Sequence, residues 1–280
     1  MEDINYDKLI IIGGAEDKEG EKTILTYVAN LIKDKEMLLI ATVASEEPKA
    51  VIKKYFKVFT DLGVKNIKEL NINDRDECSD EGRIDLVKEA KVIFFTGGDQ
   101  LRITSILGGT PLYVELRNQF ENGTIYVGTS AGASVVSETM VVYGQDEESP
   151  SKSHIEMSKG LGLLNDVVID QHFAQRGRIG RLLTAVAQNP QNIGIGIDED
   201  TAIVIDNKNM LKVIGSGAIY IVDGRNLTYS NISEQSQNEL ISIFNIVLHV
   251  LISGKKYDLV TKMPFEEENL KDEDSKSKNF

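Results

Sequence analysis

The sequence is poor in cysteine, in positive charge and in long apolar runs, and each shortage excludes a class of protein. Its single cysteine, Cys78, excludes an intramolecular disulfide and any metal site built from several cysteines. With 31 Lys and Arg against 44 Asp and Glu, the formal net charge is −13, which argues against nucleic acid or an anionic membrane as a partner. Cys78 lies in a polar stretch, 73–81, which predicts an exposed loop with a non-catalytic thiol.

No segment has the composition of a membrane span or a secretory signal. The most apolar late segment, 241–252, is too short to cross a bilayer and contains Ser242, Asn245 and His249. The first residues are acidic and lead straight into an apolar run, without the basic start and apolar core of a signal peptide. We therefore expect a cytoplasmic protein.

Apolar runs alternate with helical patterns along the first two thirds of the chain. Continuous apolar runs are typical of parallel strands covered by helices on both faces. Pro48 and Pro111 suit first helical turns, where a missing N–H costs little. The alternation predicts an α/β fold with a doubly wound, mostly parallel sheet. The predicted strands are 8–14, 37–44, 92–98, 124–128 and 167–170, and the predicted helices are 21–33, 48–62, 83–90 and 111–122.

After residue 193 the pattern changes to short strands separated by turn sequences. Strands are predicted within 193–206, 211–217 and 218–222, with tight turns at 206–209 and 223–226. We interpret this region as β-hairpin additions to the same sheet. The prediction is therefore a single α/β domain over 1–264, followed by an acidic, disordered tail at 265–280.

Polar and glycine residues follow several of the predicted strands. In open α/β sheets, ligands bind beyond the carboxyl ends of the strands, so these residues are expected to meet at one edge of one sheet. That edge would offer glycine-lined backbone, a serine, a histidine and carboxylates. The relevant segments are 97–100, 128–132, 170–172 and 198–200.

The segment 128–132 fits the G-x-S-x-G pattern of a nucleophile elbow. An apolar strand precedes it and small residues follow it, which is the context that this motif requires. Ser130 is therefore the predicted nucleophile, although it could instead only cap the following helix. Backbone N–H groups from the Gly97-Gly98 turn and from Ala131 would stabilise an oxyanion.

A serine nucleophile needs a general base, and the chain has three histidines. His249 lies in an apolar run and is predicted to be a core or half-buried strand residue. His154 lies in a polar segment predicted to be a surface loop. His172 directly follows a predicted buried strand, so we expect it to be the base.

The third member of such a triad is a carboxylate that orients the imidazole. In the run 193–199 the odd positions share one face, which favours Glu199, while Asp198 and Asp200 remain open. The resulting order Ser, His, Glu differs from the Ser, acid, His order of α/β-hydrolases. It indicates another lineage of serine hydrolases.

Three arginines, Arg176, Arg178 and Arg181, form the cationic cluster of an otherwise acidic chain. They lie at a predicted helix start, where the helix dipole disfavours cations. They could pair with surface carboxylates, but we favour binding of substrate carboxylates beside His172. A phosphate-binding glycine loop is not indicated, because the segment 13–17 after the first strand carries acids instead.

With these motifs, the sequence resembles the serine peptidase family that contains the cyanophycinases and the aspartyl dipeptidases (peptidase E). The resemblance runs from the first strand to about Leu259. The segments 94–100, 128–133, 170–181 and 194–201 carry it, and 170–181 points to the cyanophycinases. It implies a fold like class I glutamine amidotransferase domains, a homodimer, and no metal or organic cofactor.

The resemblance also implies roles for individual residues. Ser130, His172 and Glu199 would be catalytic, with the Gly98 and Ala131 N–H groups as the oxyanion hole. The implied substrate is cyanophycin, a poly-aspartate chain carrying arginine, which would be cut to β-Asp-Arg dipeptides. The implied substrate-binding residues are Gln100, Asp170, Gln171, Arg176, Arg178 and Arg181.

Two other functions stay open at this point. An aspartyl dipeptidase would use the same triad on short Asp-X peptides, and a binding protein of this fold would have lost turnover. Asp170 could meet the arginine guanidinium of cyanophycin, on charge complementarity alone. A glutamine amidotransferase is the weakest reading, because such enzymes use a cysteine nucleophile and Cys78 is misplaced for that role.

Overall fold

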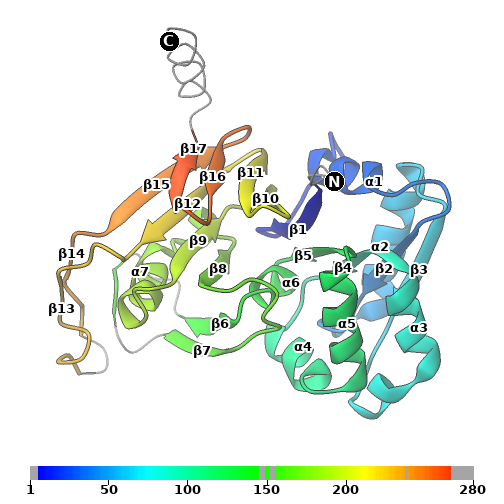
Figure 1. Ribbon diagram of the computed structural model, residues 1–280, viewed down its shortest axis with the longest axis horizontal. Helices are drawn as coiled ribbons and strands as arrows, with labels where there is room; N and C mark the ends of the chain where they lie inside the picture. The colour runs from blue at the N-terminus through cyan, green and yellow to red at the C-terminus, as the bar shows by residue number, and fades with distance from the viewer. Residues whose placement is uncertain (1–5, 145–148, 152–154, 237–238, 266–280) are drawn as a thin grey trace, which may run out of the picture.

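The computed structural model describes residues 6–144, 149–151, 155–236 and 239–265, and two β-sheets organise it (Figure 1). The larger sheet has nine strands in the order β17-β16-β11-β10-β1-β5-β4-β2-β3, and the smaller has four in the order β15-β12-β9-β8. The strands of the larger sheet are β1 (Asp7–Ile12), β2 (Met37–Ala41), β3 (Asn66–Leu70), β4 (Ala90–Phe95), β5 (Ile125–Thr129), β10 (Thr201–Asp206), β11 (Met210–Gly215), β16 (Lys256–Asp258) and β17 (Met263–Phe265). Those of the smaller sheet are β8 (Val167–Gln171), β9 (Ile193–Ile197), β12 (Ala218–Asp223) and β15 (Val247–Ile252).

Two strand pairs and a set of helices complete the described fold. The pairs are β6 (Thr139–Gly144) with β7 (Ile155–Lys159), and β13 (Tyr229–Ser230) with β14 (Ile243–Phe244). The α-helices are α1 (Thr23–Asn30), α2 (Pro48–Asp61), α3 (Glu81–Glu89), α4 (Gln100–Leu107), α5 (Pro111–Glu121), α6 (Ala131–Ser134) and α7 (Ile179–Gln188). Short 3-10 helices are η1 (Asp76–Ser79) and η3 (Ala174–Arg176).

The doubly wound, mostly parallel α/β sheet predicted from the sequence is confirmed. Strands β1, β5, β4, β2 and β3 are mutually parallel, with helices on both faces. Alternate residues of β1 enter different cores: Ile10 and Ile12 pack with α1 and α2, whereas Leu9 and Ile11 face the core that contains α3, α4 and α5. Prolines stand in the first turns of α2 and α5, as the sequence predicted.

The prediction that the late strands all extend the same sheet is wrong. Strands β10, β11, β16 and β17 do extend it, by antiparallel pairing. Strands β8, β9, β12 and β15 form a sheet of their own, in which β8 and β9 run parallel. An apolar run buried on both faces indicates a strand but not the sheet that it joins, because both sheets are covered on both sides.

The smaller sheet packs between the main core and helix α7. In the run Ile193–Ile197 the isoleucines enter the core shared with the larger sheet, which confirms that the odd positions share a face. The glycines face the other way: a Cβ at Gly194 would crowd Leu182 of α7, and one at Gly196 would crowd Phe173. Glycine at these two positions lets α7 approach the sheet closely.

Four further expectations can be compared with the structure. Cys78 was predicted in an exposed loop, but it is fully buried in η1, because the polar neighbours turn outward while the thiol packs beneath α4; burial raises the pKa of this thiol. His249 is half-buried in β15, as predicted. Phe265 ends strand β17 and so belongs to the fold, whereas 266–280, the rest of the predicted tail, lie outside the described residues. His154 also lies outside them, and Ile155–Lys159, predicted as loop, is strand β7.

The turn predicted at 206–209 joins β10 to β11, as expected of a hairpin. The turn at 223–226 instead leads away toward β13, and β12 pairs with β15 later in the chain. In the part of the chain that the structure describes, no helix has both the length and the apolar character needed to cross a bilayer.

Candidate active site

The predicted nucleophile lies at the sharp turn between β5 and α6. Ser130 has φ 52° and ψ −108°, a conformation that few non-glycine residues adopt. Glycines allow the turn, because a Cβ at Gly128 or at Gly132 would overlap neighbouring backbone. The Ser130 side chain makes no capping hydrogen bond to α6, which argues against the alternative that it only caps the helix. The geometry is that of a nucleophile elbow.

The three candidate catalytic side chains form one hydrogen-bonded series. Ser130 Oγ lies 3.0 Å from His172 Nε2, and His172 Nδ1 lies 2.6 Å from Glu199 Oε1. His172 also has a positive φ, of 52°, as the chain leaves β8. The spacing lets the imidazole accept the serine proton while the carboxylate holds its other nitrogen.

Glu199 is the carboxylate that contacts His172, while its two neighbours have other partners. Asp198 accepts hydrogen bonds from the N–H groups of Ala174 and Ala218. Asp200 accepts from the Asp17 N–H and from the Ser216 hydroxyl. The choice that the sequence left open between residues 198, 199 and 200 therefore falls on Glu199 as the partner of the imidazole.

The expectation that the site lies at one edge of one sheet is wrong. Ser130 follows β5 of the larger sheet, whereas His172 and Glu199 follow β8 and β9 of the smaller one. The loop after β1 joins the two edges: the His172 N–H donates to the Gly13 carbonyl at 2.8 Å, and the Asp200 N–H donates to the Gly14 carbonyl at 2.9 Å. The chain itself crosses between the sheets at 198–200.

Burial sets the electrostatics of the base. The pKa of His172 is lowered, first by burial and then by the nearby guanidiniums of Arg176 and Arg178, against the opposing effect of Glu199. A neutral imidazole is the form that can accept a proton from serine. The site therefore favours the catalytically useful form of His172 at neutral pH.

Glycines bring backbone close to both reacting side chains. A Cβ at Gly97 would lie 3.4 Å from Ser130 Cβ, so the 97–98 turn passes directly beside the nucleophile. Gly98 has φ 145°, and a Cβ there would overlap the Ala44 carbonyl. Ala131 begins α6, where an N–H has no acceptor within the helix. These positions are compatible with the predicted oxyanion donors.

The structure separates the predicted substrate-binding residues by their exposure. Asp170 is fully buried, and its carboxylate binds the guanidiniums of Arg178 and Arg181, which are themselves buried. The expected contact of Asp170 with a substrate guanidinium is therefore replaced by an ion-paired cluster within the fold. Arg176 is exposed, and its charge acts on His172. Of the three arginines, Arg176 is the one that can meet a substrate carboxylate from solvent.

Two predicted amides also have partners within the fold. The Gln100 amide donates to the carbonyls of Val141 and Val142 and so ties α4 to β6. Gln171 accepts a hydrogen bond from the Ser134 hydroxyl at 2.9 Å, which links the end of β8 to helix α6. Both interactions brace the surroundings of Ser130 and His172.

The sequence analysis missed the loop that follows β1. A Cβ at Gly14 would overlap the His172 ring, so only glycine can cover the imidazole from this side. Glu16, buried in the same loop, accepts a hydrogen bond from Thr129, the residue before Ser130. The position of 13–17 after a strand was a usable signal, but the segment was tested only for phosphate binding.

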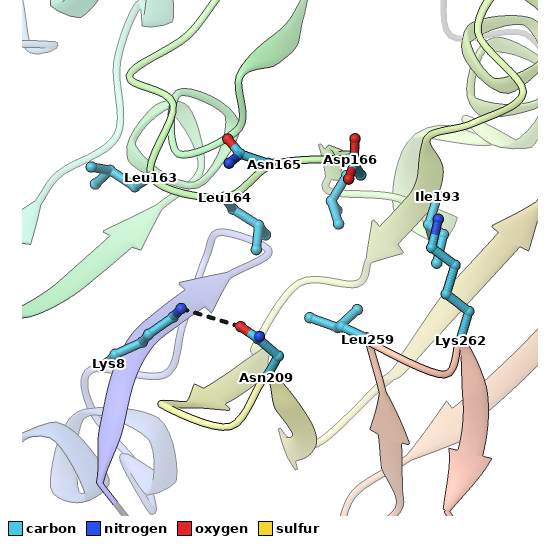
Figure 2. Close-up of a pocket in the computed structure, with 10 residues that line it drawn as sticks. Lys8, Leu163, Leu164, Asn165, Asp166, Ile193, Asn209, Leu259 and Lys262 are labelled. Carbon is cyan, nitrogen blue, oxygen red and sulfur yellow. Dashed lines mark hydrogen bonds between the residues drawn. The ribbon is translucent and has the colours of Figure 1, made fainter. Parts of the chain in front are cut away.

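A cavity of about 360 Å3 lies away from these residues (Figure 2). It opens beside Lys8, Val167 and Ile193, which stand near the starts of β1, β8 and β9. The triad follows the other ends of β8 and β9, so this cavity is distinct from the candidate site. Lys8 donates to Asn209 at 3.2 Å inside it, and burial lowers the pKa of Lys8. Among the described residues, no cluster of three or more His, Cys, Asp or Glu side chains could hold a metal ion.

Comparison with known proteins gives consistent results. The family model for peptidase family S51 matches residues 9–213. The cyanophycinase of Synechococcus elongatus is 39% identical over 255 residues, covering 90% of this chain and 79% of that protein. The cyanophycinase of Geminocystis herdmanii is 37% identical over 258 residues, covering 91% and 95%.

More distant similarities include the peptidase E of a Nostoc strain, which is 29% identical over 176 residues and covers 60% of this chain and 67% of that protein. A crystal structure of a peptidase from an acI-B1 actinobacterium superposes with a TM-score of 0.68 at 21% identity. It covers 91% of this chain and 98% of the other. This last likeness bears on the fold alone.

Proposed function

The chain belongs to peptidase family S51, and from that premise we propose that it is a serine peptidase that hydrolyses cyanophycin to β-Asp-Arg dipeptides. The observation that carries the proposal is the series Ser130–His172–Glu199, with contacts of 3.0 and 2.6 Å, in a chain 37–39% identical to cyanophycinases over about 90% of its length. The single domain over 1–264, the homodimer and the cytoplasmic location stay predictions.

In the proposed mechanism Ser130 is the nucleophile and His172 the base. Ser130 Oγ attacks the carbonyl carbon of a backbone Asp–Asp bond while its proton moves to His172 Nε2. The N–H groups of Gly98 and Ala131 stabilise the resulting oxyanion. The C–N bond then breaks, and His172 delivers its proton to the leaving amine.

The second half of the reaction restores the enzyme. Water gives a proton to His172 and attacks the acyl-enzyme carbonyl, and the ester C–O bond breaks as His172 returns the proton to Ser130. Glu199 holds the Nδ1 side of the ring and stabilises the imidazolium in both halves. Arg176 is proposed to bind a free carboxylate at the end of the substrate chain.

The test is incubation of the purified protein with cyanophycin granules, with product masses measured over time. Wild-type protein should release the Asp-Arg dipeptide, and Ser130→Ala should lower the rate by at least about 1,000-fold while leaving the fold intact. Dipeptide release by the Ser130→Ala variant at the wild-type rate would contradict Ser130 as the nucleophile.

A second candidate is an aspartyl dipeptidase, which the similarity to a peptidase E favours. It predicts free Asp from Asp-X dipeptides and no attack on the granules. Absence of both reactions, together with no labelling of Ser130 by a serine-directed covalent probe, would instead indicate a binding protein.

A further inference from the structure

One buried carboxylate near the triad has no part in the mechanism above. Glu16 lies in the loop after β1 and is 3% exposed. Its Oε2 accepts a hydrogen bond from Thr129 Oγ1 at 2.6 Å, while its Oε1 accepts from the Tyr55 hydroxyl and pairs with Lys18 Nζ at 2.9 Å. Both carboxylate oxygens therefore have defined partners.

The partners of Glu16 form a closed polar cluster. Lys18 also lies over the Tyr55 ring, 5.1 Å from its centroid. Burial and the adjacent carboxylate raise the pKa of Tyr55 well above its usual value, so this phenol remains a hydrogen-bond donor. Burying a charge costs free energy that even a good ion pair only partly offsets. An apolar residue would fill this space at lower cost, so packing alone does not account for Glu16.

The cluster acts on the residue directly before the nucleophile. Thr129 is the last residue of β5 and is buried, and Ser130 adopts its positive φ immediately afterwards. The Ser130 N–H donates to the Ile12 carbonyl at 3.1 Å. Two points therefore hold the strained turn: a backbone hydrogen bond to β1 and the Thr129 side chain fixed by Glu16.

The same loop also contacts the base and the acid segment. Gly13 accepts from the His172 N–H, and Gly14 accepts from the N–H of Asp200, the residue after Glu199. The loop after β1 thus touches the chain at all three catalytic positions. Of its side chains, Glu16 is the one that reaches the nucleophile strand.

We propose that Glu16 is a positioning residue that acts through the Thr129 hydroxyl to hold Ser130 Oγ within reach of His172 Nε2. The proposal rests on the proposed role of Ser130 as nucleophile. Misplacement of a reacting atom by about 1 Å can cost about 100-fold in rate, so a small rotation of the Ser130 turn is sufficient for a large effect.

The first test uses two substitutions at Thr129. Thr129→Val keeps the shape but removes the hydroxyl, and it should lower kcat on cyanophycin by about 10- to 100-fold with little change in KM. Thr129→Ser keeps the hydroxyl and should stay within about threefold of wild type. Wild-type kcat in a folded Thr129→Val variant would overturn the proposal.

The second test asks whether Glu16 acts through Thr129. Glu16→Gln should lower kcat by a similar factor, and the double variant Glu16→Gln/Thr129→Val should be no slower than the slower single variant, because both remove the same contact. Additive losses would overturn the route through Thr129. Glu89→Gln, at the exposed end of α3, is the matched control and should leave kcat unchanged.

A readout independent of cyanophycin separates this proposal from the proposed function. A serine-directed covalent probe labels Ser130 at a rate that depends on the position and activation of its oxygen. Slower labelling in Thr129→Val, with thermal unfolding as the check on folding, supports the proposal even if cyanophycin is not cut. Equal labelling rates in wild type, Thr129→Val and Thr129→Ser would overturn it.

Discussion

The two sheets of this protein contribute to the candidate site in different ways. The larger sheet supplies the nucleophile on a strained turn whose position is fixed by glycines and by buried polar contacts. The smaller sheet supplies His172 and Glu199, and it carries the buried Asp170–arginine cluster directly before the histidine. One sheet presents the reacting atom, and the other handles the charge.

This division shows why the junction between the sheets matters. The contact of 3.0 Å between Ser130 and His172 joins residues whose strands share no backbone pairing. The site is complete only while the edges of the two sheets stay in register. The loop after β1 keeps them there through hydrogen bonds from His172 and Asp200 to its carbonyls.

The largest effect is expected on removing charge from the smaller sheet's contribution. Glu199→Gln keeps the size of the side chain but leaves the imidazolium without its carboxylate, so kcat should fall by about 100- to 10,000-fold. Steady-state kinetics on cyanophycin would measure this fall, with Glu89→Gln as the control. A loss below about threefold would mean that the smaller sheet only supports the base, and the division of roles would fail.

An intermediate effect is expected on stability from the cluster before the histidine. Asp170→Asn leaves two buried guanidiniums without their shared carboxylate and should cost about 3–5 kcal/mol in the free energy of unfolding. Denaturant unfolding would measure it. Asp85→Asn removes an exposed ion pair with Lys88 and should cost less than about 1 kcal/mol. Equal costs for the two variants would show that the buried cluster does not stabilise the smaller sheet.

The smallest effect is expected from the exposed charge beside the base. Because the pKa of His172 is lowered, the base stays neutral below pH 6.5, and kcat/KM should fall only as the pH drops through that lowered value. Arg176→Gln removes one cause of the lowering, so the acidic limb of the pH profile should move to higher pH, less so at high salt. At pH 8 the loss in kcat/KM should stay within about tenfold.

The pH profile of kcat/KM in low and high salt measures this shift. Arg117→Gln on α5 is the matched control and should leave the profile in place. A limb that moves to lower pH in the Arg176 variant would contradict the electrostatic role of Arg176. An unmoved limb would leave burial as the whole cause of the lowered pKa.

The same pKa shift has a consequence for folding. A histidine whose pKa is lower in the folded state than in the unfolded state contributes its stability above the unfolded pKa and loses it as the pH falls through the folded value. The candidate site therefore loses its base and part of its stability over the same acidic range.

Much of the parallel sheet and the triad could be predicted from the sequence because both leave local signals. An apolar run followed by glycine, serine or histidine marks a strand and its carboxyl end, so Ser130 and His172 could be found. Glu199 followed from the alternation of residues along β9, and its contact with the imidazole bears out that choice.

The rest could not be predicted because it depends on pairing between distant segments. Nothing in the run 167–171 tells which sheet it joins, so the smaller sheet was missed. The contact between Glu16 and Thr129 spans 113 residues and has no periodic signal. Cys78 was misplaced because a single buried position within a polar turn is not visible in average polarity.

The left-handed backbone at Ser130 and His172 has a consequence for engineering. Each such residue costs about 1–3 kcal/mol relative to a relaxed conformation, and both reacting side chains stand on one. Selection for heat resistance alone would favour glycine at these two positions and would destroy the catalyst in doing so. The chain thus carries a trade-off between durability and activity at two adjacent points, and thermostable variants should be sought elsewhere in the fold.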